Sequence, residues 1–263
     1  MIDCHCHLAD PQFDNDIDDV ILRAQNSGVR GAIVCAEFLD QFDRVLELSD
    51  KYPSFAFPAF GIHPVQRGNV SANNEHYDGA EEAIIREKHR LAAVGEVGLD
   101  FTPRYIKNDE DKAVQREIFA KQIAIARSLD LPLNVHSRSA GSPVIDFLIA
   151  NGAEKVLLHA FSGNAKSAKK GIEAGFYFSI PPSFGLNKEE KKNLISAIPL
   201  EQLCLETDSP VLGPSKTERN EPMNIMHSAK LIAEVKNVSV DEVICKTTEN
   251  ALKLFPILKK WVK

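Results

Sequence analysis

The segment IDCHCHL at residues 2–8 is short, mostly apolar and typical of a buried β-strand. Side chains at positions i and i+2 of a strand point to the same face, with Cα atoms about 6.5 Å apart. We therefore expect His5 and His7 to share one face, with Asp3 on that face to orient them, and Cys4 and Cys6 to lie on the other. The segment predicts a strand with two imidazoles on one side and two buried thiols on the other.

Seven further segments of this kind follow along the chain, at residues 31–36, 55–62, 91–97, 131–136, 155–160, 176–180 and 203–207. Segments with apolar residues at helical spacing lie between them, among them 15–27, 40–51, 110–129, 143–151, 164–174 and 187–197. Eight strands that alternate with helices indicate a parallel α/β sheet, and the count of eight favours a closed (β/α)8 TIM barrel. A final helix at 239–258 is expected to pack on the outside of the barrel.

Composition is that of an ordinary globular protein, with 44% hydrophobic and 26% charged residues among 263. No Pro- or Gly-rich linker, repeat or low-complexity tract divides the chain, so we expect one domain over residues 1–263. No apolar run approaches the roughly 18 to 20 residues that span a bilayer. Five scattered cysteines and the lack of a basic N-terminal region predict an intracellular protein of the cytoplasm or nucleus, with no membrane partner.

The balance of charged residues limits the ways in which the protein could bind nucleic acid. Thirty-one Lys and Arg against 37 Asp and Glu give a net charge of −6. Non-specific coating of duplex DNA relies on a broad basic surface, which this balance excludes. It leaves open an enzyme that contacts a few phosphates through metal ions.

Histidines and acids fall at the ends of the expected strands: His5, His7, His63, Glu96, His136, His159 and Asp208. In a TIM barrel the C-terminal strand ends form one rim, where catalytic groups are placed. Each position also has a structural explanation, since a single histidine is commonly a hydrogen-bonded core residue. Glu96 could pair with a cation, and Asp208 could cap a helix, with Glu206 as its rival on the same face. Together, the positions indicate a site.

The donor types indicate which metals such a site would hold. Imidazoles and carboxylates without thiolates suit Zn, Mn, Fe or Mg at a catalytic site, whereas structural zinc usually recruits paired cysteines at spacings that this chain lacks. Six ligands are more than one tetrahedral ion needs. We therefore expect two divalent cations per chain, Mg, Mn or Zn, with a carboxylate between them.

The motifs resemble those of the TatD-type metal-dependent deoxyribonucleases, most closely the eukaryotic TatD-domain branch. They run in family order over nearly the whole chain: DCHCHL (3–8), GIHP (61–64), GEVGLDF (95–101), HSRSAG (136–141), HAFSG (159–163), ETDSP (206–210), RNEP (219–222) and TENALKLF (248–255). The chain has Ala160 where the family usually has Cys, at a position that is not a ligand.

This resemblance implies a TIM barrel of the metal-dependent hydrolase, amidohydrolase-like type with a two-metal site. One ion would be held by His5, His7, Glu96 and Asp208, and the other by Glu96, His136 and His159. The expected reaction is hydrolysis of DNA phosphodiester bonds, with Glu96 bridging the metals and Asp208 also handling the proton. The family suggests 3′-to-5′ exonuclease action on single-stranded DNA or 3′ ends, with no obligate protein partner.

Residues around this site are candidates for contacts with substrate. His63 is expected to meet a phosphate or leaving oxygen, and Arg138 either to pair with phosphate or to support a metal-binding carboxylate. Further positive charge is offered by Arg104, Lys107, Lys216 and Arg219. Two rival functions remain: hydrolysis of a small amide, lactone or phosphoester, which this chemistry also supports, and a non-catalytic scaffold. A groove with basic residues beside the metals favours nucleic acid, and a closed apolar pocket favours a small molecule.

Overall fold

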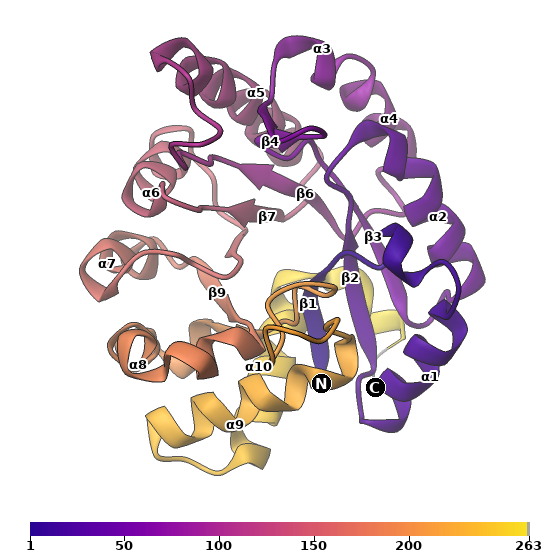
Figure 1. Ribbon diagram of the computed structural model, residues 1–263, viewed down its shortest axis with the longest axis vertical. Coiled ribbons are helices and arrows are strands. Elements are labelled where there is room, and N and C mark those ends of the chain that lie inside the picture. The colour runs from indigo at the N-terminus through magenta and orange to yellow at the C-terminus, as the bar shows by residue number, and fades with distance from the viewer. Residues whose placement is uncertain (262–263) are drawn as a thin grey trace.

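A parallel sheet of eight strands forms the centre of the molecule and helices surround it (Figure 1). The computed structural model describes residues 1–261, so the last two residues of the expected domain lie outside them. The TIM barrel predicted from the sequence is confirmed, and all eight predicted strands are present. In sheet order they are β1 (Ile2–Cys6), β2 (Gly31–Cys35), β3 (Ala56–Phe60), β6 (Ala93–Gly98), β7 (Leu133–His136), β8 (Val156–Leu158), β9 (Tyr177–Ile180) and β10 (Leu203–Leu205).

Most helices lie between successive strands and pack on the outside of the barrel, and the last two follow the final strand. They are α1 (Ile17–Asn26), α2 (Phe42–Lys51), α3 (Asn74–Tyr77), α4 (Ala80–Glu87), α5 (Asp109–Ser128), α6 (Gly141–Ala150), α7 (Ala165–Glu173), α8 (Lys188–Ala197), α9 (Ile225–Lys236) and α10 (Val240–Leu254). A short antiparallel hairpin of β4 (Val65–Gln66) and β5 (Val70–Ser71) follows β3. None of the described helices is both long and apolar enough to cross a membrane.

Two apolar clusters fill the fold. The larger one lies between the sheet and the helices and includes Val34, Val94 and Ile118. The smaller joins Ile2, Ile33 and Leu157, which come from β1, β2 and β8. Because β1 and β8 are not neighbours in the sheet, these side chains meet across the barrel interior.

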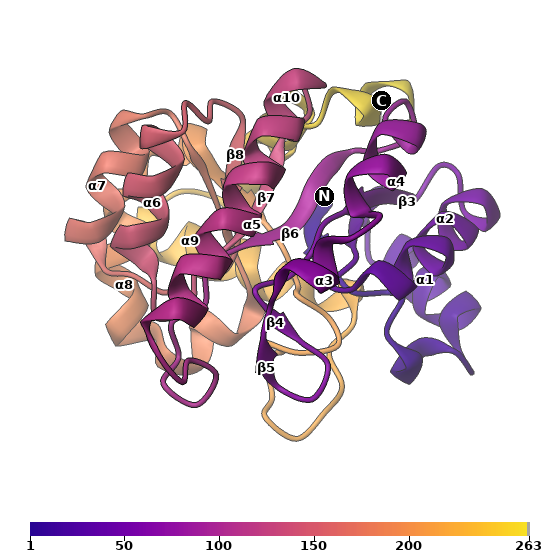
Figure 2. The ribbon, with the colours of Figure 1, turned by 90° about the horizontal axis from the view of Figure 1, so that it is seen from above.

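The final helix covers one end of the barrel. Leu254 of α10, with Phe255 and Leu258 just beyond it, belongs to the interior cluster and packs with Ile2 at the start of β1. Figure 2 shows this C-terminal segment on the opposite side of the molecule from hairpin β4–β5 and the loop after β10. A final helix is present as predicted, but it ends at Leu254 rather than at 258, and its end closes the mouth where the strands begin instead of packing only on the outside. The opposite rim is left open.

Strand β1 contains a bulge that changes which side chains point inward. Asp3 pairs with Ala32 and Cys6 with Val34, so three steps along β1 are matched by two along β2. Cys4 therefore lies in the interior cluster, whereas Cys6 lies in the outer one. The expectation that the two thiols share a face is wrong, because the strand does not alternate regularly through the bulge.

The barrel closes between β1 and the segment that follows β10. The backbone N–H of Asp208 donates to the carbonyl of His5 over 2.9 Å, and that of His7 donates to the carbonyl of Ser209 over 2.8 Å. These two bonds fix Asp208 beside the two histidines of the opening strand, which are about 200 positions away in sequence.

Candidate metal centre

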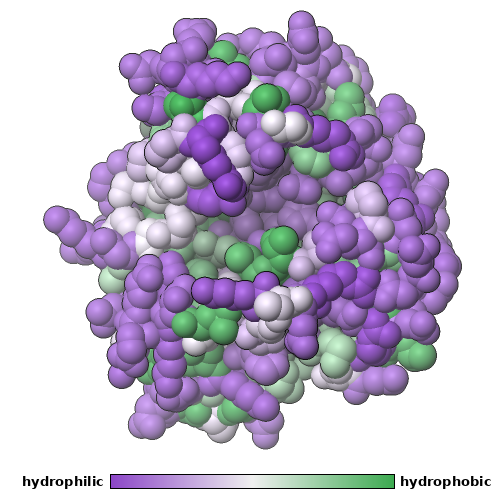
Figure 3. Space-filling model, in the orientation of Figure 1, coloured by the Kyte–Doolittle hydropathy of each residue, from purple (hydrophilic) through white to green (hydrophobic). Residues whose placement is uncertain are grey.

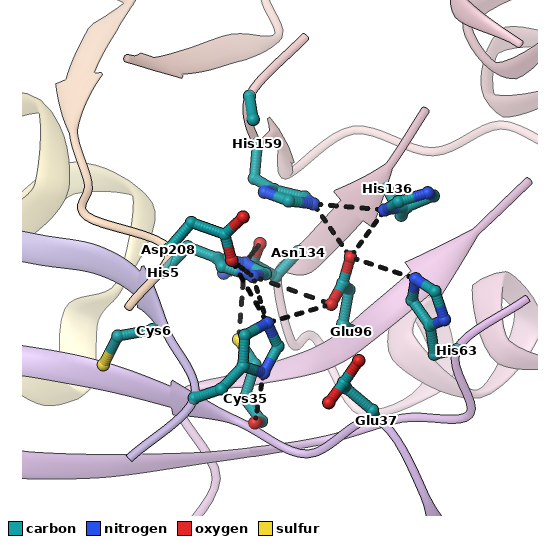
Figure 4. Close-up of polar contacts among 12 residues, drawn as sticks. His5, Cys6, Cys35, Glu37, His63, Glu96, Asn134, His136, His159 and Asp208 are labelled. Carbon is teal, nitrogen blue, oxygen red and sulfur yellow. Dashed lines mark hydrogen bonds and ion pairs between the residues drawn. The ribbon is translucent and has the colours of Figure 1, made fainter. Parts of the chain in front are cut away.

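All six predicted metal ligands meet at the C-terminal rim of the barrel. Glu96 of β6 lies among the histidines (Figure 4). The Glu96 atom Oε1 is 2.8 Å from both His136 Nδ1 and His159 Nε2. Its other oxygen, Oε2, is 3.6 Å from His5 Nε2 and 3.3 Å from His7 Nε2. The carboxylate therefore faces two separate pairs of imidazoles, one with each oxygen.

Asp208 joins the pair formed by His5 and His7. Its Oδ1 atom is 3.4 Å from His5 Nε2 and 3.3 Å from His7 Nε2, and these two nitrogens are 3.0 Å apart. All of these side chains are buried, so their polar atoms face one another instead of bulk water.

The ring nitrogens that face away from the cluster are held by hydrogen-bond acceptors. His5 Nδ1 lies 2.8 Å from Asn134 Oδ1, and His7 Nδ1 lies 3.1 Å from the carbonyl of Cys35. His136 Nε2 lies 3.0 Å from Asp100 Oδ2. With the outer nitrogen protonated toward its acceptor, the inner nitrogen presents a lone pair, the arrangement typical of histidines that bind metal.

Asn134 itself is fixed from the other side. Its amide donates to the carbonyl of Cys4 over 2.8 Å, which leaves Oδ1 as the acceptor that faces His5. This contact also ties β7 to β1 across the barrel interior.

His159 has no such hydrogen bond in the described part of the chain. Its Nδ1 atom is buried without a hydrogen-bond partner, and Glu206 Oε2 lies 3.8 Å away. Glu206 accepts from the backbone N–H of Ala160 over 2.9 Å and from the Ser179 hydroxyl over 2.5 Å. Glu206, the alternative to Asp208 in the sequence analysis, thus lies behind His159 and not between the imidazoles of the cluster.

The protonation states of the carboxylates and histidines in the cluster depend on their burial and on the charges of their neighbours. Burial by itself would raise the pKa of Glu96, but the histidines around it outweigh burial and hold this pKa well below the usual value. The pKa of Asp208 is lowered in the same way by His5 and His7. Burial and neighbouring His5 lower the pKa of His159 to about 4, so its imidazole is neutral near pH 7. Two carboxylates and a neutral imidazole are therefore available as ligands.

The residues present fit a divalent metal. Three groups bring their donor atoms within 4.8 Å of one another: His5 with His159 and Asp208, His5 with His7 and Glu96, and His63 with Glu96 and His136. All donors are imidazole nitrogens or carboxylate oxygens, a set suited to zinc, manganese or iron and, through its carboxylates, magnesium.

The two predicted substrate contacts lie at the edge of the cluster. His63 Nε2 is 3.5 Å from Glu96 Oε1, close enough for His63 to belong to one of the candidate metal groups. Arg138 Nε and Nη2 both lie 2.8 Å from Asp100 Oδ2, so Arg138 supports the carboxylate that holds His136. Its side chain is 47% exposed and lines the cavity above the cluster.

Other predicted basic residues are occupied differently. Arg219 forms ion pairs with Asp16 and Glu221, which neutralise it. Arg104 stacks on the ring of Tyr105, and Lys216 lines a neighbouring cavity.

Sequence reasoning did not identify Asn134, Asp100 and Glu37 as site residues. Asn134 lies two positions before His136 on β7, and Glu37 follows the end of β2 on the same rim. Position at a strand end could have identified Glu37, which lines the cavity together with His7. The spacing within a strand could have identified Asn134.

The cavity above the cluster has a volume of about 220 Å³. Its walls include Asp10, Gln12, Glu37 and Val211 in addition to the ligands. Seen from the rim, the molecule has a hollow at its centre, with apolar side chains at the margin (Figure 3).

Comparison with known proteins identifies the family. The family model described as TatD related DNase matches residues 2–256, nearly the whole chain. The chain belongs to the TatD family. The resemblance predicted from the motifs is therefore confirmed.

Individual relatives agree with this TatD assignment. The human protein named deoxyribonuclease TATDN3 is 49% identical over 263 residues, which cover 98% of this chain and 96% of that protein. The metal-dependent hydrolase YabD of Bacillus subtilis is 35% identical, covering 98% of this chain and 99% of that protein. The crystal structure of the TatD homologue YjjV from Escherichia coli superposes with a TM-score of 0.88 at 26% identity, covering 97% of this chain and 98% of that one.

Proposed function

We propose that this TatD protein is a metal-dependent deoxyribonuclease that hydrolyses DNA phosphodiester bonds with two divalent cations. Membership of a family of metal-dependent hydrolases supports the reaction class. The observation that carries the proposal is the position of Glu96, whose two carboxylate oxygens face two different pairs of histidines. A single ion would leave one of these pairs unused.

The proposed ligand sets follow this division. His5, His7, Glu96 and Asp208 would hold one ion, and Glu96, His136 and His159 the other, with Mg, Mn or Zn as candidate metals. Bound cations of this kind supply Lewis-acid stabilisation of the phosphodiester and make water more acidic. The outer partners Asn134 and Asp100 would keep the rings of His5 and His136 in the orientation that binding needs.

Side chains of the site are assigned to proton transfer and to contacts with the substrate. Asp208 is ionised at neutral pH, because His5 and His7 lower its pKa, and we assign its carboxylate to accept the proton of the attacking water. His63 directs Nε2 toward the cluster while its Nδ1 is held by the backbone of Val65, 2.7 Å from the carbonyl. We assign His63 to the phosphate or leaving oxygen. Arg138 would contact a phosphate with the part of its guanidinium that Asp100 does not hold.

The substrate is proposed to be a single-stranded or 3′ end of DNA, cleaved in the 3′-to-5′ direction by one domain spanning the chain. The centre is reached through a cavity of about 220 Å³ whose walls are shared with two larger neighbours. An extended substrate fits this arrangement better than a small ester enclosed in an apolar pocket.

The test is incubation of the metal-reconstituted protein with end-labelled single-stranded DNA, duplex DNA and RNA, and with bis(p-nitrophenyl) phosphate. Each substrate is used with and without a chelator. We expect chelator-sensitive cleavage of DNA with shortening from the 3′ end. Absence of cleavage of any nucleic acid, with turnover of the small phosphodiester, would instead establish the small-molecule hydrolase.

A further inference from the structure

A second cavity adjoins the metal centre on the side of β9 and β10. Its walls come from the segment 183–191, which contains the end of a 3-10 helix and the start of α8, and from the loop 210–218 after β10. Pro210 and Val211 line both this cavity and the one above the metal cluster. We call it the β10 cavity. The two spaces share a wall, so a substrate whose phosphate lies at the metal cluster can extend into the β10 cavity.

The sizes of the two cavities differ in a way that matters for a nucleotide. Small-molecule sites usually occupy about 300–1,000 Å³. The cavity above the metal cluster has about 220 Å³, and the β10 cavity has about 500 Å³. The metal centre alone is therefore too small to enclose a nucleotide, whereas the β10 cavity has room for one.

Three of the exposed side chains that line the β10 cavity are apolar. Leu186, Val211 and Leu212 are 44%, 53% and 36% exposed and all line it. Apolar side chains that gather around a hollow commonly mark a binding site, because their burial by a ligand is favourable. A flat, mostly apolar nucleobase face is a suitable partner for this surface.

Two lysines at the same cavity add positive charge. Lys191 places its ammonium group 4.6 Å from the centre of the Phe184 ring, and its ion-pair contact with Glu190 is long, at 3.9 Å. Lys216 is exposed on the loop after β10, with Glu218 as the acidic member of the lining. Apolar walls with two cations match the base and the phosphate of a nucleotide.

The loop that forms one wall is tied to a proposed metal ligand. The backbone N–H of Val211 donates to the carbonyl of Asp208 over 2.9 Å, and that of Ser183 donates to the carbonyl of Leu212 over 2.9 Å. Asn220 braces the same loop by donating to the carbonyl of Val211 over 2.7 Å. A base held here is therefore held at a defined distance from Asp208.

The cavity on the other side of the metal centre fits a phosphate less well. It has about 390 Å³ and includes Arg67 and Arg138. Both arginines are paired with acids, Arg67 with Asp40 at 3.0 Å and Arg138 with Asp100 at 2.8 Å, and the carboxylate of Glu37 adds negative charge.

We infer that the β10 cavity is a nucleotide subsite for single-stranded DNA, in which an unpaired base lies against Leu186, Val211 and Leu212 while Lys191 and Lys216 contact a flanking phosphate. This inference rests on the proposed nuclease function and adds to it the place of the neighbouring nucleotide. A base in a Watson–Crick pair cannot present its face to the cavity, so the subsite favours single strands.

Binding to a cleavage-resistant probe tests the subsite independently of turnover. The probe is a fluorescein-labelled, phosphorothioate-linked single-stranded deoxyhexamer, and its dissociation constant is measured by fluorescence anisotropy. The apolar variant is Leu186→Ser/Leu212→Ser, and its matched control is Leu22→Ser/Ile85→Ser, at side chains 54% and 46% exposed on α1 and α4. We expect the apolar variant to bind about tenfold more weakly, which corresponds to about 1.4 kcal/mol, and the control to bind like the wild type.

The lysines are tested through salt dependence. Each lysine that meets a phosphate contributes about 0.7 to the slope of log affinity against log salt for a single strand. The single variant Lys216→Gln should therefore reduce this slope by about 0.7. The double variant Lys191→Gln/Lys216→Gln should reduce it by about 1.4. The control Lys169→Gln/Lys230→Gln, on α7 and α9, should leave it unchanged. An unchanged slope in both cavity variants contradicts the assignment of the lysines.

Kinetics separate the subsite from the proposed function. In the apolar variant we expect kcat/KM to decrease on a single-stranded oligonucleotide and to change little on bis(p-nitrophenyl) phosphate, which has no base. The fold-decrease on the oligonucleotide should be at least about ten times that on the small substrate. Equal losses on both substrates, or wild-type affinity for the hexamer, would overturn the subsite. A wild-type protein that binds the hexamer through these residues but cleaves no DNA would retain the subsite and refute the nuclease.

Discussion

At the scale of single residues, Glu96 lies between the two groups of histidines of the candidate metal centre. Its two oxygens lie within 2.8–3.6 Å of five imidazoles, those of His5, His7, His63, His136 and His159. Such a carboxylate could not remain buried and ionised without these partners, because transfer of an unpaired charge from water is very costly. The same contacts that keep Glu96 charged make it suited to lie between two cations.

Replacement of Glu96 therefore tests the bridging assignment. In Glu96→Ala we expect a loss of at least one bound cation per chain. Mutation of a residue that only hydrogen-bonds to a metal ligand typically lowers metal affinity or activity about 10–100-fold. Loss of the bridging ligand itself should therefore lower metal-dependent cleavage by more than about a hundredfold. Metal content is measured by elemental analysis, folding by circular dichroism and activity with end-labelled DNA. Glu154→Ala, at an exposed position before β8, is the control. Near-native turnover in a folded Glu96→Ala protein would exclude the bridge.

Asn134 provides a second test, at a residue that touches no substrate. In Asn134→Leu the Nδ1–H of His5 loses its acceptor while the volume of the side chain is kept. Metal affinity should fall about 10–100-fold, which titration calorimetry of the metal-free protein measures directly. Asn134→Asp keeps an acceptor toward His5 and should lose less. Equal affinities in the wild type and Asn134→Leu would show that Asn134 serves only the packing of β7 on β1.

At the scale of elements, the strands were predictable and their irregularities were not. All eight strands gave short apolar segments, and the meeting of the candidate ligands at one rim followed from the geometry of a parallel barrel. The bulge in β1 cannot be recognised in the sequence IDCHCHL, because the same residue pattern is compatible with a regular strand and with one whose register shifts against β2. Pairing with β2, set by the fold, decides that Cys4 and His5 both belong inside.

The segments that the sequence analysis did not name include one helix of 12 residues, α9, and several short elements. Helix α3 has four residues and α4 eight, and the strands of hairpin β4–β5 have two residues each. Helical periodicity needs a longer window to be recognised. The outer partners of the ligands were missed for another reason. Spacing within β7 places Asn134 on the face of His136, but its contact with His5 joins residues 129 positions apart, so the spacing does not reveal the partner.

The bulge predicts unequal effects at the two cysteines of β1. In Cys4→Ser a hydroxyl replaces a thiol in the apolar interior, where the nearest acceptor recorded for Cys4 Sγ is the Ile2 carbonyl at 4.0 Å. In Cys6→Ser the Ile33 carbonyl, 3.4 Å from Cys6 Sγ, can still accept a hydrogen bond. Cys4→Ser should therefore lower the free energy of unfolding by about 1–3 kcal/mol and Cys6→Ser by less. Urea titration measures both.

Neither thiol points to the metal cluster as a ligand, so both serine variants should keep the wild-type number of bound cations. Loss of one cation per chain in either variant would contradict the proposed ligand sets.

At the scale of the whole molecule, the barrel has two ends with different tasks. The C-terminal rim holds the polar cluster and the two adjoining cavities, whereas the other mouth is filled by the apolar end of α10. Stability and chemistry are thus separated along the barrel axis. A change at the closed mouth should lower stability without altering the composition of the metal centre, a division known for TIM barrels in general.

Phe255 allows this separation to be tested, because it is fully buried in the interior cluster with Ile2 and Leu254. Phe255→Ala should lower the free energy of unfolding by about 3–5 kcal/mol, since the cavity left by a buried aromatic ring closes only in part. Under conditions where the variant is still folded, its cation stoichiometry and its kcat on DNA should stay near those of the wild type. Trp261→Ala, at a side chain 49% exposed, is the control and should change stability by less than about 0.5 kcal/mol. A parallel loss of bound cations and stability in Phe255→Ala would show that the closed mouth and the metal centre are coupled through the barrel interior.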